Sequence, residues 1–403
     1  MKKSETNVKM KNKNERNASF NLLEVIVIII MTSLVVGVAT GVTVYKNYKE
    51  DDNSKNKSSD IYLDELKGAY NNIINGYVEK VDQSKLVDAA IQGMYQYLGD
   101  PYTSYIDEEA TEDLTDRLNG EYTGIGVEIT KVENGILVIT VFEGGPAQKA
   151  GVEAGDIIVK VNGEDITSKS AAEVSSMIKN SKSNTIEISF LRAGITITKT
   201  LNISNVNVPS VSKENFDGVG YIKIDTFSNT TYSQFKNALE SLENEGIKSL
   251  IIDVRNNGGG YLNSAVEIAE LFIEKGKNIY GLENKNGTTF YTDDTKTKKE
   301  YKIAVLINGA SASASEILTC ALKESYGITT IGTTSYGKGT VQETSTLSTG
   351  GMVKYTTAYW LTPNGNKINN VGIIPDIEVK MEYIENLTYE TDVQLQSAIN
   401  AVK

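Results

Sequence analysis

Apolar residues first gather near the N-terminus, where residues 25–45 form an uncharged run of 21 residues. A helix of this length can cross the roughly 30 Å hydrocarbon core of a membrane. Basic residues are in excess before the run and are mixed with acidic residues after it, which predicts a cytoplasmic N-terminus and an extracytoplasmic remainder. We therefore expect a basic cytoplasmic tail over 1–24, a single transmembrane helix in the cell membrane over 25–45 and a polar linker over 46–59. A cleaved signal peptide is the alternative interpretation, and it exports the bulk of the chain equally.

Helical spacing follows the linker. Apolar residues recur every three or four positions over 61–74 and again over 86–98, which predicts two amphipathic helices. Asp100-Pro101 ends the second helix, because proline disfavours the helical conformation in the residue before it. We expect a small helical element over 60–119.

From about Gly120 the apolar period shortens to that of β-strands, and one longer helix, over 170–180, interrupts the strands. A short helix is expected at Pro146-Ala147. These elements predict a compact β domain over 120–205. The strand-like runs are 126–130, 136–141, 156–161, 186–191 and 195–201.

Beyond Pro209 strands alternate with helices, which is typical of an α/β layer domain. We expect this domain over 206–380 and a C-terminal helical tail over 381–403. The segments together predict a multidomain protein of α/β and α+β class. The alternating elements are strands over 220–226, 249–254, 303–307 and 328–332, and helices over 231–245, 262–273 and 313–325.

Composition restricts the chemistry that this chain can perform. The 403 residues include no histidine and one cysteine, and the formal net charge is −12. Without histidine, a nucleophilic serine would need lysine, a carboxylate or water as its base, and histidine-dependent zinc sites are excluded. The negative charge and the lack of a basic stripe argue against a nucleic-acid partner. We expect the chemistry of this chain to need no metal and no organic cofactor.

Two common motifs occur in incomplete form. Residues 332–339 lack only the hydroxyl of a phosphate-binding P-loop, because glycine stands at 339, where the magnesium-binding serine or threonine is needed. The S-x-x-K motif of penicillin-binding proteins occurs three times without a K-T-G partner, and we expect all three copies on the solvated surface. The three pairs are Ser176 with Lys179, Ser210 with Lys213, and Ser233 with Lys236.

The motif S-A-S-A-S-E over 311–316 is followed by G-K-G-T-V-Q over 337–342. Together with three further motifs, this pair resembles the C-terminal processing peptidases, also called tail-specific proteases, of serine peptidase family S41. The resemblance implies a ClpP/crotonase-like α/β peptidase domain with Ser313 as nucleophile, Lys338 as base and Gln342 as the residue that orients the lysine. The further motifs are D-P-Y-T-S-Y over 100–105, D-V-R-N-N-G-G-G over 253–260 and G-I-I-P-D-I over 372–377.

The physical chemistry of these positions favours the same chemistry. Ser313 begins a predicted helix, whose free N–H groups and dipole can stabilise an oxyanion. We expect the N–H of Ala314 to be the first donor and a glycine of the loop 258–260 to be the second, and the family resemblance favours Gly259. Lys338 must be neutral to act as a base, so its pKa has to fall through burial.

Other residues near these motifs have structural interpretations. Asp253 and Arg255 are expected to form an ion pair that shapes the glycine loop, and Cys320 is expected to be a small core residue. Ser311 and Ser315 are expected to cap or pack the helix start.

The sequence Gly124-Ile125-Gly126-Val127 resembles the peptide-binding loop of a PDZ domain of the bacterial protease type. The resemblance implies that N–H groups of this loop bind the terminal carboxylate of a peptide, which adds as a strand beside the domain. The other motifs of this resemblance are G-G-P-A over 144–147, A-G over 150–151, G-D-I-I over 155–158 and V-N-G over 161–163.

These interpretations combine into one hypothesis, a membrane-tethered, extracytoplasmic serine endopeptidase that cleaves proteins near their C-termini. Its partners are protein or peptide substrates with free C-terminal tails. The family resemblance also implies a homodimer with contacts over 60–100 and 380–403. Two alternatives stay open, an inactive PDZ scaffold and a peptidase that is inactive until the PDZ domain moves.

Overall fold

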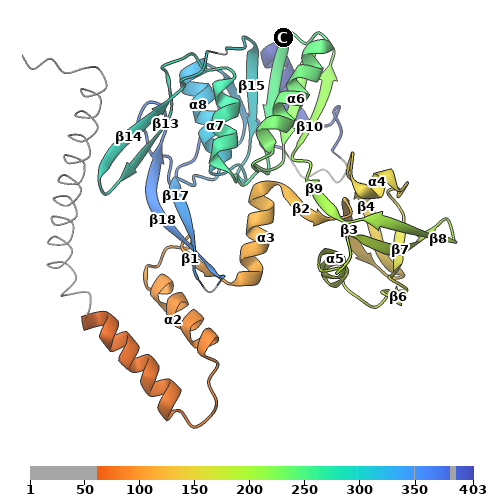
Figure 1. The fold of residues 1–403 in the computed structure, drawn as a ribbon. Coiled ribbons are helices and arrows are strands. Elements are labelled where there is room, and N and C mark those ends of the chain that lie inside the picture. Colours follow the sequence, from red (N-terminus) through yellow and green to blue (C-terminus); the bar gives the residue numbers. More distant parts are fainter. Residues whose placement is uncertain (1–60, 297, 349, 382–386) are drawn as a thin grey trace, which may run out of the picture. The chain divides into compact units, whose positions relative to one another are not determined.

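The computed structural model describes residues 61–296, 298–348, 350–381 and 387–403 (Figure 1). The expected tail, transmembrane helix and linker over 1–59 lie outside these residues, and within them no helix is long and apolar enough to cross a membrane. The described residues divide into two compact units, 61–87 and 88–403. Residues 61–76 of the first unit are helical, as their amphipathic period predicts. A second helix, α2 (Gln83–Tyr97), begins in the first unit and continues into the other.

The expected β domain is an antiparallel sheet in the order β3-β4-β5-β7-β8, with β6 beside β5. Its core is formed by alternate residues of the strands, such as Ile136 and Val138, together with Val174 and Ile178 from one helix. That helix begins with a capping box between Ser170 and Glu173. The elements are β2 (Glu121–Gly124), β3 (Val127–Val132), β4 (Gly135–Val141), α4 (Pro146–Lys149), β5 (Ile157–Val161), β6 (Glu164–Asp165), α5 (Ala171–Lys179), β7 (Thr185–Arg192), β8 (Ile195–Asn202) and β9 (Ser204–Asn207), the last paired with β2.

The α/β domain is built on a six-stranded sheet in the order β10-β11-β12-β15-β16-β19, parallel except between β10 and β11. The buried strand β12 separates two cores, because Leu250 and Ile252 face α6, α7 and α8 while Ile251 faces α9. The elements are β10 (Val211–Phe216), β11 (Val219–Ile224), α6 (Thr231–Asn244), β12 (Ser249–Asp253), α7 (Leu262–Glu270), β15 (Lys302–Ile307), α8 (Ala314–Ala321), η1 (Leu322–Tyr326), β16 (Thr329–Gly332), β19 (Ile377–Glu378) and α9 (Val393–Val402).

A second, antiparallel sheet in this domain was not predicted. It has the order β1-β18-β13-β14, with β17 also paired to β18. Every residue of β14 is exposed and β17 is largely polar, so neither strand carries the apolar alternation that marks a strand in the sequence. The strands are β1 (Ser104–Ile106), β13 (Asn278–Asn284), β14 (Gly287–Thr292), β17 (Thr340–Thr346) and β18 (Met352–Leu361).

Three further details differ from the sequence-based expectation. A polar helix, α3 (Glu108–Asn119), follows β1 and is capped by the side chain of Asp107. The helix expected over 313–325 is α-helical only to Ala321 and then becomes the π-helical turn η1. In the described part of the C-terminal tail, the helix α9 is confined to Val393–Val402.

Candidate active site

The loop between β15 and α8 holds Ser313 in an unusual backbone conformation. Ser313 is the N-cap of α8 and has φ 56° and ψ −116°. A non-glycine residue in this region is strained, and such strain at a helix start is common at functional sites. The first N–H of α8, on Ala314, donates no hydrogen bond within the described part of the chain, so it is free for a ligand.

The glycine loop after β12 lies directly against Ser313. A Cβ atom on Gly259, where φ is 100°, would stand 2.8 Å from Ser313 Cβ and 3.0 Å from the nitrogen of Ala314. Only glycine fits this approach. Asn257 holds the loop in place, because its main-chain oxygen accepts hydrogen bonds from Ala312 N (3.0 Å) and Ser315 Oγ (2.8 Å).

The side chain of the same asparagine accepts a hydrogen bond from the N–H group that was predicted as the second oxyanion donor. Gly259 N donates to Asn257 Oδ1 at 2.9 Å, whereas Ala314 N is free. Sequence reasoning identified both N–H groups but not this internal acceptor. In this conformation the structure therefore offers only the Ala314 member of the predicted pair of oxyanion donors.

Glu316 connects the Ser313 loop to the loop that carries Lys338. This carboxylate is fully buried and accepts hydrogen bonds from the N–H groups of Ser313 (2.8 Å), Gly337 (2.7 Å) and Lys338 (2.9 Å) and from Ser335 Oγ (2.6 Å). It therefore sets the distance between the two backbones. It also occupies the N–H groups that a P-loop would offer to phosphate, which supports the exclusion of a nucleotide site.

Lys338 is half-buried, and burial lowers the pKa of its ammonium group, as a catalytic base requires. Lys354 adds to the lowering of this pKa, whereas Asp100 and Glu316 oppose it. Lys338 Nζ lies 4.8 Å from the ring centre of Tyr102. The structure gives no hydrogen bond between the described side chains of Ser313 and Lys338, although both line one cavity.

That cavity has a volume of about 560 Å³ and brings together Ser313, Ala314, Lys338 and Gln342. Gln342 Nε2 donates to Thr340 Oγ1 (2.9 Å) and Thr356 Oγ1 (3.2 Å) and forms no hydrogen bond with Lys338 in the described structure. Sequence reasoning missed several other lining residues, and the spacing of the two leucines on α3 is the only local signal for any of them. The missed residues include Leu114, Leu118, Tyr261, Ile317 and Lys354.

None of the four residues of the predicted peptide-binding loop, Gly124–Val127, is among the residues that line this cavity. Ile125 is buried and Gly126 has φ 82°. Val127 N donates to the hydroxyl of Tyr122 at 3.0 Å, and the Tyr122 ring fills the space that a Cβ on Gly124 would need. A tyrosine side chain thus occupies one of the N–H groups predicted for a peptide carboxylate.

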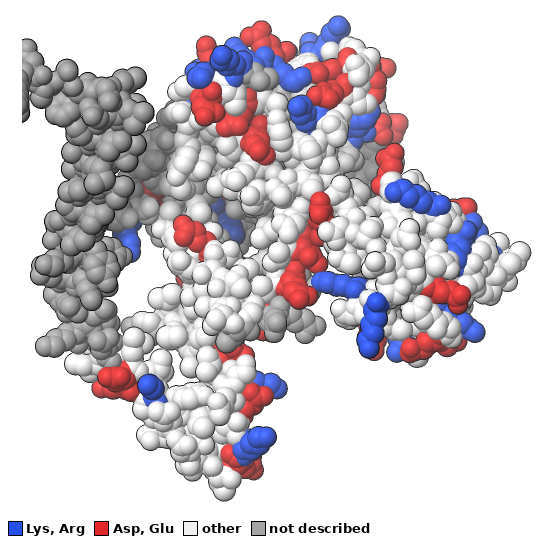
Figure 2. Space-filling model, viewed as in Figure 1, with Lys and Arg blue, Asp and Glu red and all other residues white. Residues whose placement is uncertain are grey.

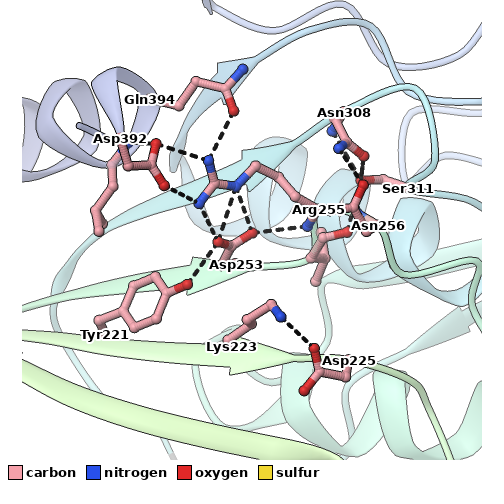
Figure 3. A network of polar contacts seen from close by, with 12 residues as sticks. Tyr221, Lys223, Asp225, Asp253, Arg255, Asn256, Asn308, Ser311, Asp392 and Gln394 are labelled. Atoms are coloured by element: carbon pink, nitrogen blue, oxygen red, sulfur yellow. Dashed lines mark hydrogen bonds and ion pairs between the residues drawn. The ribbon is translucent and has the colours of Figure 1, made fainter. Parts of the chain in front are cut away.

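Arg255 forms the centre of a buried polar network (Figure 3). Its Nη2 lies 2.6 Å from Asp253 Oδ2 and 2.8 Å from Asp392 Oδ2, and its Nη1 donates to Gln394 Oε1 at 2.9 Å. Burial alone would lower the pKa of Arg255, but the hydrogen bonds to both aspartates outweigh it and raise the pKa. The expected ion pair with Asp253 is confirmed, and it also anchors the segment that leads into α9.

Several other sequence-based expectations can now be checked. Cys320 is buried in the core. The hydroxyls of Ser311 and Ser315 donate to the main-chain oxygens of Val254 and Asn257, so both are structural. Of the three S-x-x-K serines, those at 176 and 233 are exposed as expected, but the expectation was wrong for Ser210, which is buried and hydrogen-bonded to Thr231 Oγ1.

Charged side chains are mixed over the described surface. On the face shown in Figure 2, lysine and arginine residues are interspersed with aspartate and glutamate, and no continuous basic band is present there.

Comparisons with known proteins agree with the geometry. Residues 218–379 match the family described as Peptidase family S41, residues 113–191 match the PDZ domain family, and residues 31–110 match the Activating protease CtpB N-terminal domain.

Two similar proteins come from Bacillus subtilis (strain 168). The chain is 37% identical over 338 residues to the carboxy-terminal processing protease CtpA, and the aligned region covers 82% of this chain and 72% of that protein. It is 39% identical over 325 residues to the carboxy-terminal processing protease CtpB, and that aligned region covers 79% of this chain and 68% of that protein. A solved S41 protease structure from Bacteroides fragilis shares the fold at a TM-score of 0.50 and 16% identity, and covers 80% of this chain and 90% of that one.

Proposed function

The chain belongs to peptidase family S41 as a PDZ-containing, serine-type C-terminal processing peptidase, and we propose that Ser313 and Lys338 are its catalytic dyad. The observation that carries this proposal is the shared cavity, which is lined both by Ser313 at a helix start and by a half-buried lysine of lowered pKa. Histidine is absent from the whole sequence, so no imidazole base competes for the role.

In the proposed mechanism, neutral Lys338 accepts the proton of Ser313 Oγ, which attacks the scissile carbonyl carbon. Ala314 N–H donates to the oxyanion that forms. The protonated lysine then gives its proton to the leaving amine, and water releases the acyl group from Ser313 by the reverse sequence. Gly259 contributes the second donor only after its N–H leaves Asn257 Oδ1, and Gln342 orients the lysine.

The lack of a Ser313–Lys338 hydrogen bond in the described structure supports a peptidase that rearranges before it acts. Ser313 Oγ and Lys338 Nζ have to come within hydrogen-bond distance of each other, and the glycine loop has to release one N–H. A PDZ domain that binds the substrate's C-terminal tail is a suitable trigger for such a change.

The cellular setting is also part of the proposal. The uncharged run over 25–45 would tether the chain to the cell membrane with its catalytic part outside the cytoplasm. Substrates would be proteins with free C-terminal tails, captured by the loop Gly124–Val127 and cleaved near their ends. A homodimer through residues 60–100 and 380–403 belongs to the same proposal.

Replacement of Lys338 by methionine tests the dyad. We expect kcat to fall about a hundredfold to ten-thousandfold, because a general base contributes about this much. In the wild type, activity should rise as the pH increases through the pKa of Lys338, which burial places below its usual value of 10.5.

The measurement is the pH profile of kcat/KM on an unfolded protein with a free C-terminus, with the full chain in detergent. Ser176→Ala, at an exposed S-x-x-K serine, is the matched control and should leave the profile unchanged. A Lys338→Met protein that keeps both its rate and this acid limb would contradict the dyad.

A further inference from the structure

Residues 100–105 connect α2 to β1 and lie against β18 (Figure 1). Asp100 Oδ2 accepts hydrogen bonds from Thr103 Oγ1 (2.6 Å) and Thr356 Oγ1 (2.5 Å), and Asp100 Oδ1 accepts one from Tyr102 N (3.0 Å). Thr356 N donates in turn to Thr103 Oγ1 at 3.1 Å. The turn from Asp100 to Thr103 is therefore stabilised by hydrogen bonds within it and is hydrogen-bonded to β18.

One residue of this turn reaches the proposed base. The ring of Tyr102 faces Lys338 Nζ at 4.8 Å, within the range of a cation–π interaction. A hydrogen bond from the Tyr102 hydroxyl to Tyr336, and then burial, raise the pKa of Tyr102 to about 12. The neutral ring, and not a phenolate, thus meets the lysine at neutral pH.

Asp100, the first residue of the turn, is connected to Gln342, the residue that is proposed to orient the base. Thr356 Oγ1 donates to Asp100 and accepts the hydrogen bond of Gln342 Nε2 at 3.2 Å. Gln342 lies opposite Thr356 in the pairing of β17 with β18. One hydroxyl therefore connects the carboxylate of Asp100 to the side-chain amide of Gln342.

We propose that the Asp100–Thr103 turn positions the catalytic base, with Tyr102 confining the Lys338 side chain and Asp100 fixing Gln342 through Thr356. This inference rests on the proposed dyad. The charged groups that face Lys338 are Lys354 on β18, Asp100 in the turn and Glu316 on α8. Tyr102 and Asp100 are positioning residues, because they act on the reaction only through Lys338 and Gln342.

Two variants of the turn test this role in the full chain. Tyr102→Leu removes the ring, and we expect kcat to fall about tenfold or more, because small displacements of a catalytic group are costly. Tyr102→Phe keeps the ring and should retain nearly the wild-type kcat. Asp100→Asn removes a negative charge near Lys338 at almost constant volume, so the acid limb of the pH profile should move to lower pH.

Tyr291→Leu, at an exposed tyrosine of β14, is the matched control and should change neither kcat nor the pH profile. The inference is overturned if Tyr102→Leu keeps or raises kcat, since a raised kcat would mean that Tyr102 holds the lysine away from Ser313. The inference is also overturned if the acid limb of the pH profile lies at the same pH in Asp100→Asn as in the wild type. Failure of the dyad itself is separate, because it would appear as a fully active Lys338→Met protein.

Three carboxylates meet on the α/β domain where α7 ends and β14 leads into the next loop. Oxygens of Glu270, Asp293 and Asp294 lie within 4.8 Å of one another. Asp293 is 1% exposed, and while its Oδ1 accepts Thr295 N at 2.7 Å, its buried Oδ2 has no hydrogen-bond partner among the residues that the structure describes. No ion pair among the described residues includes any of these three carboxylates.

Like charges this close destabilise the fold unless a cation lies between them. Ca²⁺ binds carboxylate oxygens at about 2.3–2.6 Å in a flexible geometry, whereas Mg²⁺ demands a near-ideal octahedron and keeps several of its waters. We infer that Glu270, Asp293 and Asp294 form a structural Ca²⁺ site. None of them lines the catalytic cavity, so this inference is independent of the dyad.

Calorimetric titration of the chelator-treated full chain with Ca²⁺ tests the site. We expect one ion per chain at this site and a Tm about 5 °C higher at a Ca²⁺ concentration of about one hundred times Kd. Asp293→Asn should abolish this rise, yet it should raise the Tm of the metal-free protein because it removes one of the repelling charges. Asp64→Asn, at an exposed position in the N-terminal helix, should preserve the rise. Absence of binding to the wild type, unchanged Ca²⁺ stabilisation of Asp293→Asn, or a lower metal-free Tm in that variant would each overturn the inference.

Discussion

Ser313→Ala should lower kcat/KM by on the order of a millionfold, to the level left by binding and by the N–H of Ala314 alone. The reason is that the hydroxyl is the proposed attacking atom, and Lys338 then has no proton to accept. The measurement is cleavage of an unfolded protein by equal amounts of wild type and variant. Similar cleavage by both proteins would show that Ser313 is not the nucleophile.

Ser313→Gly distinguishes an activity loss caused by removal of the hydroxyl from an activity loss caused by misfolding. Ser313 has φ 56°, a value that costs little for glycine but strains alanine as it strains serine. We therefore expect the glycine variant to be equally inactive and more stable than the alanine variant, by on the order of 1 kcal/mol. A loss of activity caused by misfolding would instead lower the stability of both variants.

Arg255→Leu should lower the free energy of unfolding by about 3–5 kcal/mol, because it leaves two buried carboxylates without their cation. The side chains of Asp253 and Asp392 are 1% and 5% exposed, so water cannot replace the guanidinium. Unfolding can be followed by the fluorescence of Trp360, the single tryptophan, which is buried in the core of the α/β domain.

The control for this prediction removes the charges together. A triple variant that combines Arg255→Leu with Asp253→Asn and Asp392→Asn leaves no buried charge and should recover much of the lost stability. If Arg255→Leu alone unfolds like the wild type, the network of Figure 3 contributes nothing to the stability of the domain.

Much of the fold could be predicted from local periodicity. Strands such as β12 and β15 are buried runs of branched apolar residues, and helices such as α6 show a clear amphipathic spacing. Strands β14 and β17 could not be predicted in this way, because β14 is exposed throughout and β17 is mostly polar. Their pairing partners, and not their own composition, hold them in the sheet.

The proposed catalytic pair was predicted from its motif spacing, but the groups around it were not. Glu316 joins the loops of Ser313 and Lys338 with one carboxylate, and Tyr102 approaches Lys338 from 236 positions earlier in the chain. Asn257 occupies the N–H of Gly259, which a pattern of three glycines does not indicate.

Absence of histidine limited the base of a nucleophilic serine to lysine, a carboxylate or water, and the sequence motifs then pointed to Ser313 and Lys338. The β and α/β segments could also be recognised from the sequence, since both have strong local periods. The folded arrangement was needed to show that the described side chains of the proposed dyad are not hydrogen-bonded to each other, that the N–H of Gly259 is occupied and that a distant turn reaches Lys338. Those features depend on hydrogen bonds and ring contacts between segments far apart in the chain, and no local pattern of residues encodes such distances.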